Sequence, residues 1–152
     1  MLQKKRLDVK KLLGWLVLWL FIAVYPMMLS IYLFLPLFIG VAGYMLLVGL
    51  EDNRIGYILA AMLYLVNLDV NLSLPFWLIF FAVFPVYWFV FPVLKALQRC
   101  PQCKAFISIL LIDMLFLLTV KGYDFVMQTD TVAVDSILFF TLIVDLIVAV
   151  LL

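Results

Sequence analysis

Long uncharged segments alternate with short polar ones along this chain. The first uncharged segment covers residues 12–50, about twice the roughly 20 apolar residues that one membrane-crossing helix needs. It therefore predicts two helices with a tight turn between them. Pro26 places that turn at residues 25–30, because proline lacks a backbone donor and disfavours helix in the residue before it.

Taken in order, the apolar segments predict an all-α fold. We expect a polytopic membrane helix bundle with about six transmembrane helices, forming a single integral membrane domain over residues 1–152. The predicted spans are residues 12–29, 32–50, 55–70, 74–94, 105–121 and 132–152. The polar connections between them are short, so the sequence leaves no room there for a soluble domain.

The composition agrees with a position in lipid. Hydrophobic residues make up 70% of the chain and charged residues 12%, against roughly 45–50% and 25% in soluble domains. A soluble domain of this size still exposes roughly 30% of its chain surface, too much for so apolar a sequence. The net charge of +1 does not indicate a nucleic-acid partner. The expected partners are the lipid bilayer and other membrane proteins or further copies of this chain.

The basic residues are distributed unevenly, which predicts an orientation. With six spans, one side of the membrane carries the basic N-terminus at residues 1–11, the turn at 51–54, the loop at 95–104 and the C-terminus. Every lysine and arginine except Lys121 lies on that side, so the positive-inside rule makes it cytoplasmic. We expect an integral protein of the bacterial cytoplasmic (inner) membrane, with both termini in the cytoplasm. Polar residues on the other side, including Asn67, can attract cations, although solvated loops are the more common use of such residues.

The loop at 95–104 contains both cysteines, Cys100 and Cys103, in a CxxC motif. Such a pair can act in redox chemistry or supply half of a zinc site. A four-cysteine zinc site would need a second copy of the chain, and zinc is the one cofactor that the sequence suggests. A lasting structural disulfide is not expected in a reducing cytoplasm. The alternative is a simple connecting loop with two reduced cysteines.

Two aspartates lie inside predicted spans, Asp113 in the fifth and Asp145 in the sixth. An ionisable residue inside a span costs roughly 2.5–3.5 kcal/mol on insertion scales, and such residues are usually functional. At 1.5 Å per residue both lie roughly 10–12 Å from the cytoplasmic edge, and consecutive antiparallel helices usually pack side by side. The two carboxylates can therefore face each other at one level, and a shared proton or cation is one interpretation. The alternatives are aspartates that only specify helix packing, and a frayed sixth span that leaves Asp145 at the headgroups.

The fourth span is rich in aromatic residues at helical spacing, and it contains Pro85, which is expected to kink it. An aromatic stripe of this kind can line a cavity for an apolar ligand, although packing or lipid contact is the more common use. The cavity-lining candidates are Trp77, Phe81, Phe84 and Trp88.

The sequence shows no catalytic constellation. It has no histidine, the commonest general base and metal ligand, and no nucleophile motif. We therefore expect a non-enzymatic subunit or assembly factor that acts through membrane partners. One alternative is a small transporter, or a cation- or proton-translocating subunit, that uses Asp113 and Asp145. A second is a thiol-redox or zinc-binding membrane protein that uses Cys100 and Cys103.

Overall fold

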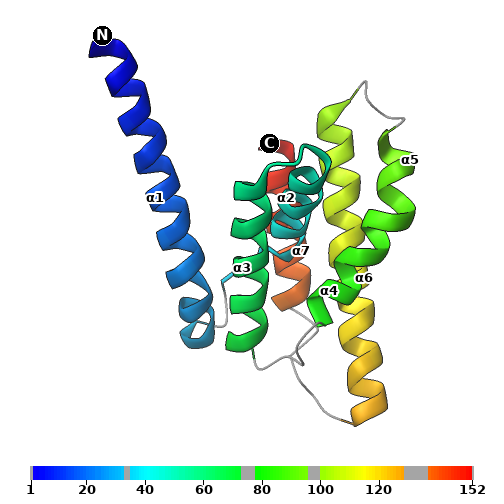
Figure 1. The fold of residues 1–152 in the computed structure, drawn as a ribbon. Helices are drawn as coiled ribbons and strands as arrows, with labels where there is room; N and C mark the ends of the chain where they lie inside the picture. Colours follow the sequence, from blue (N-terminus) through cyan, green and yellow to red (C-terminus); the bar gives the residue numbers. More distant parts are fainter. Residues whose placement is uncertain (1, 33–34, 73–77, 96–99, 129–136, 152) are drawn as a thin grey trace.

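A computed structural model describes five ranges of the chain: residues 2–32, 35–72, 78–95, 100–128 and 137–151. Within these ranges the chain is helical with short connections and contains no strand, which confirms the all-helical part of the prediction. The elements are α1 (Leu2–Ile31), α2 (Ile39–Glu51), α3 (Ile55–Asn71), α4 (Leu78–Pro85), the π-helical turn η1 (Val86–Val90), α5 (Phe91–Lys95), α6 (Pro101–Met127) and α7 (Ile137–Leu151) (Figure 1).

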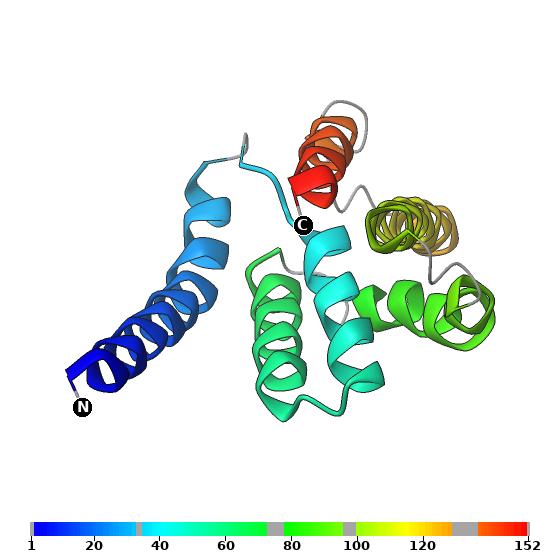
Figure 2. The same ribbon diagram turned by 90° about the horizontal axis from the view of Figure 1, so that it is seen from above.

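Helix α2 lies at the centre of the bundle. It packs against α3, α6 and α7, while α1 packs against α3 and α4 packs against α6 (Figure 2). The end of α2 is joined to the start of α6 by an ion pair, in which Lys104 Nζ lies 2.6 Å from Glu51 Oε2. The start of α1, the turn after α2, the start of α6 and the end of α7 all lie at one end of the molecule (Figure 1).

The turn predicted at residues 25–30 is wrong, because α1 continues through Pro26 to Ile31. A proline in a helix leaves the carbonyl four residues earlier without its usual donor, which here is the carbonyl of Ile22. The side chain of Asn67 on α3 donates a hydrogen bond to that carbonyl at 3.0 Å. The cost of the proline is thus partly offset by a neighbouring helix. Asn67 is half-buried in this contact, so the prediction of a solvated loop residue was also wrong.

Helix α1 instead ends at Ile31 and α2 begins at Ile39, and the described residues between them, 32 and 35–38, are not helical. The predicted second span, residues 32–50, is therefore helical over a shorter length than expected. Carbonyl groups in the break are bonded by tyrosines from flanking helices: the Tyr25 hydroxyl donates to Pro36 O at 2.7 Å and the Tyr64 hydroxyl to Leu37 O at 2.8 Å. These bonds let non-helical backbone lie inside the bundle.

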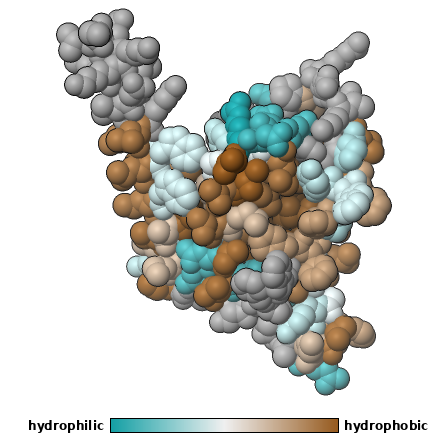
Figure 3. Space-filling model, viewed as in Figure 1, coloured by the Kyte–Doolittle hydropathy of each residue, from teal (hydrophilic) through white to brown (hydrophobic). Residues whose placement is uncertain are grey.

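The helix lengths support a membrane protein only in general terms, and they do not establish six membrane-crossing helices. Within the described ranges, two helices are long and apolar enough to cross a bilayer by themselves: α1, through Leu12–Leu29, and α6, through Gln102–Met127. The shorter apolar helices are Ile39–Glu51, Ile55–Asn71, Leu78–Val90 and Phe139–Val150. The predicted count of six transmembrane helices is thus not confirmed. The face shown in Figure 3 is predominantly hydrophobic, with hydrophilic residues gathered towards its upper and lower parts.

Several predicted span limits also shift. Helix α6 extends beyond the predicted span 105–121 at both ends, and its polar C-terminal part stays helical as far as Met127. After Pro85 the helix changes from α4 to the π-helical turn η1, in agreement with a disturbed hydrogen-bond ladder at that proline. Residues 33–34 of the predicted second span, 74–77 of the fourth, and 132–136 and 152 of the sixth lie outside the described residues.

Candidate functional site

The N-terminus of α2 lacks a capping side chain of its own. Its N-cap residue, Phe38, adopts a left-handed conformation with φ 50° and makes no side-chain capping bond. Such a conformation is uncommon for a bulky residue, and it is held here by ring contacts with Tyr25 and Phe21, whose ring centroids lie 5.4 and 6.4 Å away. The first amides of α2 therefore need acceptors from elsewhere in the chain.

Asp145 on α7 supplies that acceptor. The amide of Gly40 donates a hydrogen bond to Asp145 Oδ2 at 2.9 Å, across a sequence separation of 105 residues. The carboxylate also benefits from the partial positive charge, roughly half a unit, at the start of a helix. Asp145 is thus a remote N-cap for α2, a role that sequence reasoning did not assign to it.

Asp113 on α6 reaches the same glycine. A Cβ atom added to Gly40 would lie 2.7 Å from Asp113 Oδ1 and 2.8 Å from Asp113 Oδ2, so the absence of a side chain makes room for this carboxylate. The structure therefore brings both predicted aspartates together, and it adds Gly40, which the sequence analysis did not select. The sequence alone did not indicate this role, because the start of α2 at Ile39 is known only from the structure.

Both carboxylates are deeply buried. Asp145 has no exposed surface and Asp113 is 7% exposed. One oxygen of each, Asp113 Oδ2 and Asp145 Oδ1, has no hydrogen-bond partner within the described part of the chain. Two neighbouring buried negative charges are costly, and a helix N-terminus balances only part of that charge. A bound proton or a monovalent cation would balance the rest.

A small cavity of about 10 Å³ adjoins Asp113. Its size suits one water-sized species. Its lining combines the Asp113 carboxyl group and the hydroxyl-bearing Thr141, which is buried one turn before Asp145 on α7, with the apolar residues Ile39, Phe116, Leu117 and Leu142. One oxygen-bearing side chain from α6 and one from α7 therefore border a mainly apolar space large enough for a single small ligand.

Cys100 and Cys103 are joined by a disulfide at the start of α6, contrary to the expectation of reduced cysteines. Cys100 is the N-cap of this helix, and Cys103 lies in the first turn, so the helix itself brings the two sulfur atoms close. A disulfide leaves neither cysteine available as a thiolate ligand for zinc. Among the described residues, no group of three or more potential metal ligands of the Cys, Asp or Glu type is gathered.

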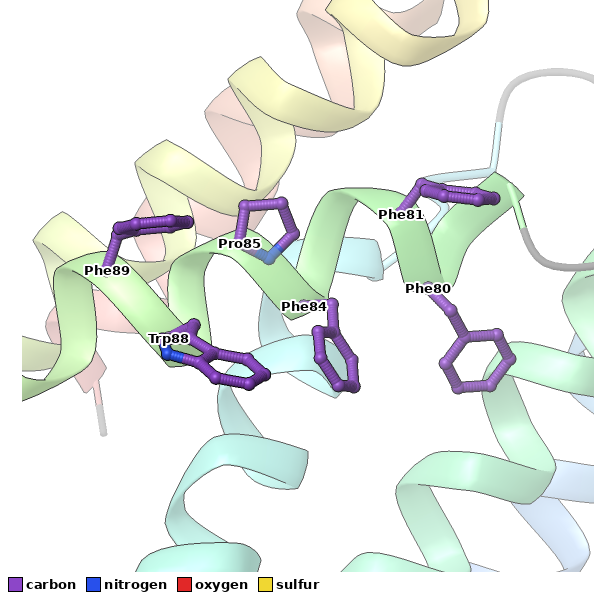
Figure 4. A pocket seen from close by; sticks show the side chains of 6 residues that line it. All are labelled: Phe80, Phe81, Phe84, Pro85, Trp88 and Phe89. Carbon is purple, nitrogen blue, oxygen red and sulfur yellow. The ribbon is translucent and has the colours of Figure 1, made fainter.

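The aromatic candidates form an open groove on the surface of α4 and η1, not an enclosed cavity. Phe81, Phe84 and Trp88 are exposed, at 68%, 60% and 67% respectively, and Trp77 lies outside the described residues. Figure 4 shows two rows of side chains along the helix. One row contains Phe80, Phe84 and Trp88, and the other contains Phe81, Pro85 and Phe89; together they line a groove of about 420 Å³. The role of this stripe in ligand binding stays a prediction.

Comparison with known proteins gives no match: no family model fits the chain, and no curated protein or solved structure is significantly similar to it. Function is therefore inferred from the geometry of the described residues alone.

Proposed function

We propose that this chain is a small, non-enzymatic integral membrane protein that binds one proton or monovalent cation between Asp113 and Asp145, as part of a proton- or cation-translocating unit. One observation carries the proposal. Two carboxylates from neighbouring helices, both buried, meet at the N-terminus of a third helix inside the bundle. Ionisable groups in such apolar surroundings are expensive, and in membrane proteins they commonly mark ion or proton pathways.

The form of α2 supports a membrane protein of this kind. With 13 residues it is about 20 Å long, shorter than the roughly 30 Å hydrocarbon core. Non-helical backbone at membrane depth is tolerated where protein buries it, and in the break before α2 Leu37 is buried and its carbonyl is bonded by Tyr64. In many transporters, interrupted helices present such termini to ions and substrates near the middle of the membrane.

The arrangement of the chain ends supports six membrane segments with both termini in the cytoplasm. The start of α1, the turn after α2, the start of α6 and the end of α7 lie at one end of the bundle (Figure 1). The sequence places every basic residue except Lys121 in or beside these segments. This asymmetry is the pattern that the positive-inside rule associates with the cytoplasmic side.

Thiol labelling tests this orientation. After reduction with dithiothreitol, Cys103 in intact cells is expected to resist a membrane-impermeant maleimide and to react once the membrane is permeabilised. Cys103 is exposed on the structure, so only the membrane would protect it. The double variant Cys100→Ser, Cys103→Ser serves as the unlabelled control. Labelling in intact cells would show that the start of α6 faces outward and would contradict the proposed orientation.

Carbodiimide labelling tests the carboxylate pair without knowledge of a transported substrate. Dicyclohexylcarbodiimide reacts with protonated carboxyl groups in apolar surroundings. We expect one adduct per chain on Asp113 or Asp145, located by mass spectrometry of the protein in lipid vesicles. The double variant Asp113→Asn, Asp145→Asn should lose it. Protection by added sodium ions would identify a cation as a ligand, and labelling unaffected by salt would identify a proton.

Asp124→Asn is the matched control, since it makes the same change in the polar C-terminal part of α6. It should leave the labelling of Asp113 and Asp145 unchanged. An unmodified pair in the wild-type protein, under conditions where carboxyl groups outside the pair react, would show that neither buried carboxylate holds a proton and would refute a proton site. The expectation that the protein acts through membrane partners stays a prediction.

A further inference from the structure

The disulfide between Cys100 and Cys103 spans only the first turn of α6. The two residues are three apart in sequence and their Cα atoms are 5.2 Å apart. A crosslink stabilises a fold mainly by restricting the unfolded chain, and the effect is small for so short a loop. Both residues also hold their places as parts of α6. Breaking the bond therefore removes little from the fold, and a purely structural role does not account for it.

The two sulfur atoms differ in their surroundings. Cys103 is exposed, whereas Cys100 is half-buried. The amide of Cys103 donates a hydrogen bond to Cys100 Sγ, with a nitrogen–sulfur distance of 3.2 Å. The N-terminus of α6 adds its partial positive charge at the same place. Both effects stabilise a thiolate on Cys100, which makes Cys100 the better leaving group when the disulfide is attacked.

We propose that Cys100 and Cys103 form a thiol–disulfide exchange site for a low-molecular-weight thiol of the glutathione class. The thiolate of the small molecule attacks Cys103 Sγ, the bond between the cysteines breaks, and its electron pair passes to Cys100 Sγ. A second small thiolate then attacks the sulfur of the small molecule in the mixed disulfide and releases Cys103. In total, two small thiols are oxidised to one disulfide, and the cysteine pair gains two electrons and two protons.

This exchange site is separate from the carboxylate pair. Asp113 lies further along α6, and no step of the exchange involves it. The adjacent Lys104 forms an ion pair with Glu51 that joins the start of α6 to the end of α2 and does not involve either cysteine. Thiol–disulfide exchange at the cysteine pair can therefore be tested independently of proton or cation binding at the carboxylate pair.

The experiment uses the oxidised full-length protein in lipid vesicles, incubated with graded ratios of reduced to oxidised glutathione. After acid quenching, a large maleimide reports each free thiol as a gel shift. We expect each chain to carry either two maleimide labels or none. The fraction of labelled chains should rise in a single transition as the ratio of reduced to oxidised glutathione increases. Mass spectrometry of samples quenched early should find the glutathione adduct on Cys103 at least fivefold more often than on Cys100. Exchange should be at least tenfold faster than in the denatured chain.

Single-cysteine variants keep the assignment testable if the transient adduct escapes detection. Cys100→Ser leaves the exposed Cys103, which is expected to retain bound glutathione as a mixed disulfide. Cys103→Ser leaves the half-buried Cys100, which should react with glutathione several times more slowly. Two results would overturn the proposal. One is a pair that stays oxidised at glutathione ratios that reduce the denatured chain. The other is a reduced protein that retains zinc shared between two chains and resists reoxidation.

Discussion

Replacing Gly40 with alanine is expected to destabilise the protein by about 1–3 kcal/mol, the usual range for overfilling a packed interior. The added Cβ would lie 2.7 Å from both Asp113 Oδ1 and Ile109 Cγ2, so α2 and α6 would have to separate or the carboxylate would have to turn away. The same change should abolish carbodiimide labelling of the aspartate pair. Unfolding in detergent mixtures measures the change in stability, and mass spectrometry measures the loss of carbodiimide labelling.

Gly14→Ala is the matched control, because nothing lies within 4 Å of a Cβ added there. In the exposed interior of a helix, alanine is more favourable than glycine by roughly 0.5–1 kcal/mol. The control should therefore be neutral or slightly stabilising and should leave the labelling intact. If Gly40→Ala were as stable as Gly14→Ala, the close approach of α2 to Asp113 would be refuted.

Replacing Asp145 with alanine is expected to cost about 1–3 kcal/mol, the penalty for leaving a buried donor without its acceptor. The donor is the amide of Gly40, whose bond to Asp145 Oδ2 caps α2. The N-terminal turn of α2 should also lose protection from hydrogen exchange, because no local side chain can replace this cap. Hydrogen-exchange mass spectrometry of the protein in nanodiscs would measure that change.

Asp145→Asn separates capping from proton or cation binding. Its amide oxygen can still accept the bond from Gly40, so stability and exchange protection should remain close to those of the wild type. It has no carboxyl group, however, and can neither titrate nor react with carbodiimide. If the alanine and asparagine variants lost stability equally, the capping role of Asp145 would be ruled out.

Simple geometry indicated from the sequence that Asp113 and Asp145 could lie at the same level on neighbouring helices. Both are ionisable residues in apolar segments, their depths follow from the rise per residue, and consecutive helices usually pack as neighbours. The third member, Gly40, could not be selected in the same way. Its role depends on where α2 begins, and that point is fixed by contacts of the preceding break with Tyr25 and Tyr64, which are distant in sequence.

The position of the helix break between α1 and α2 also depends on contacts between residues that are distant in sequence. Pro26 was the clear helix breaker within the first apolar segment, yet α1 continues through it because Asn67, on another helix, bonds the freed carbonyl. Pro36 lies in the actual break. The sequence contained both prolines, but only tertiary contacts decide which of them interrupts a helix. Helix type could therefore be predicted across most of the chain, whereas the boundaries within residues 12–50 could not.

The remote cap of α2 also has a consequence for biogenesis. Helix α2 leaves the ribosome early, but Asp145 is made 105 residues after Gly40. At a synthesis rate of roughly 5–20 residues per second, the wait is about 5–20 s. During that interval the first turn of α2 must be protected by water, lipid headgroups or the insertion machinery. Helix α7, which is synthesised well after α2, thus completes the centre of the bundle.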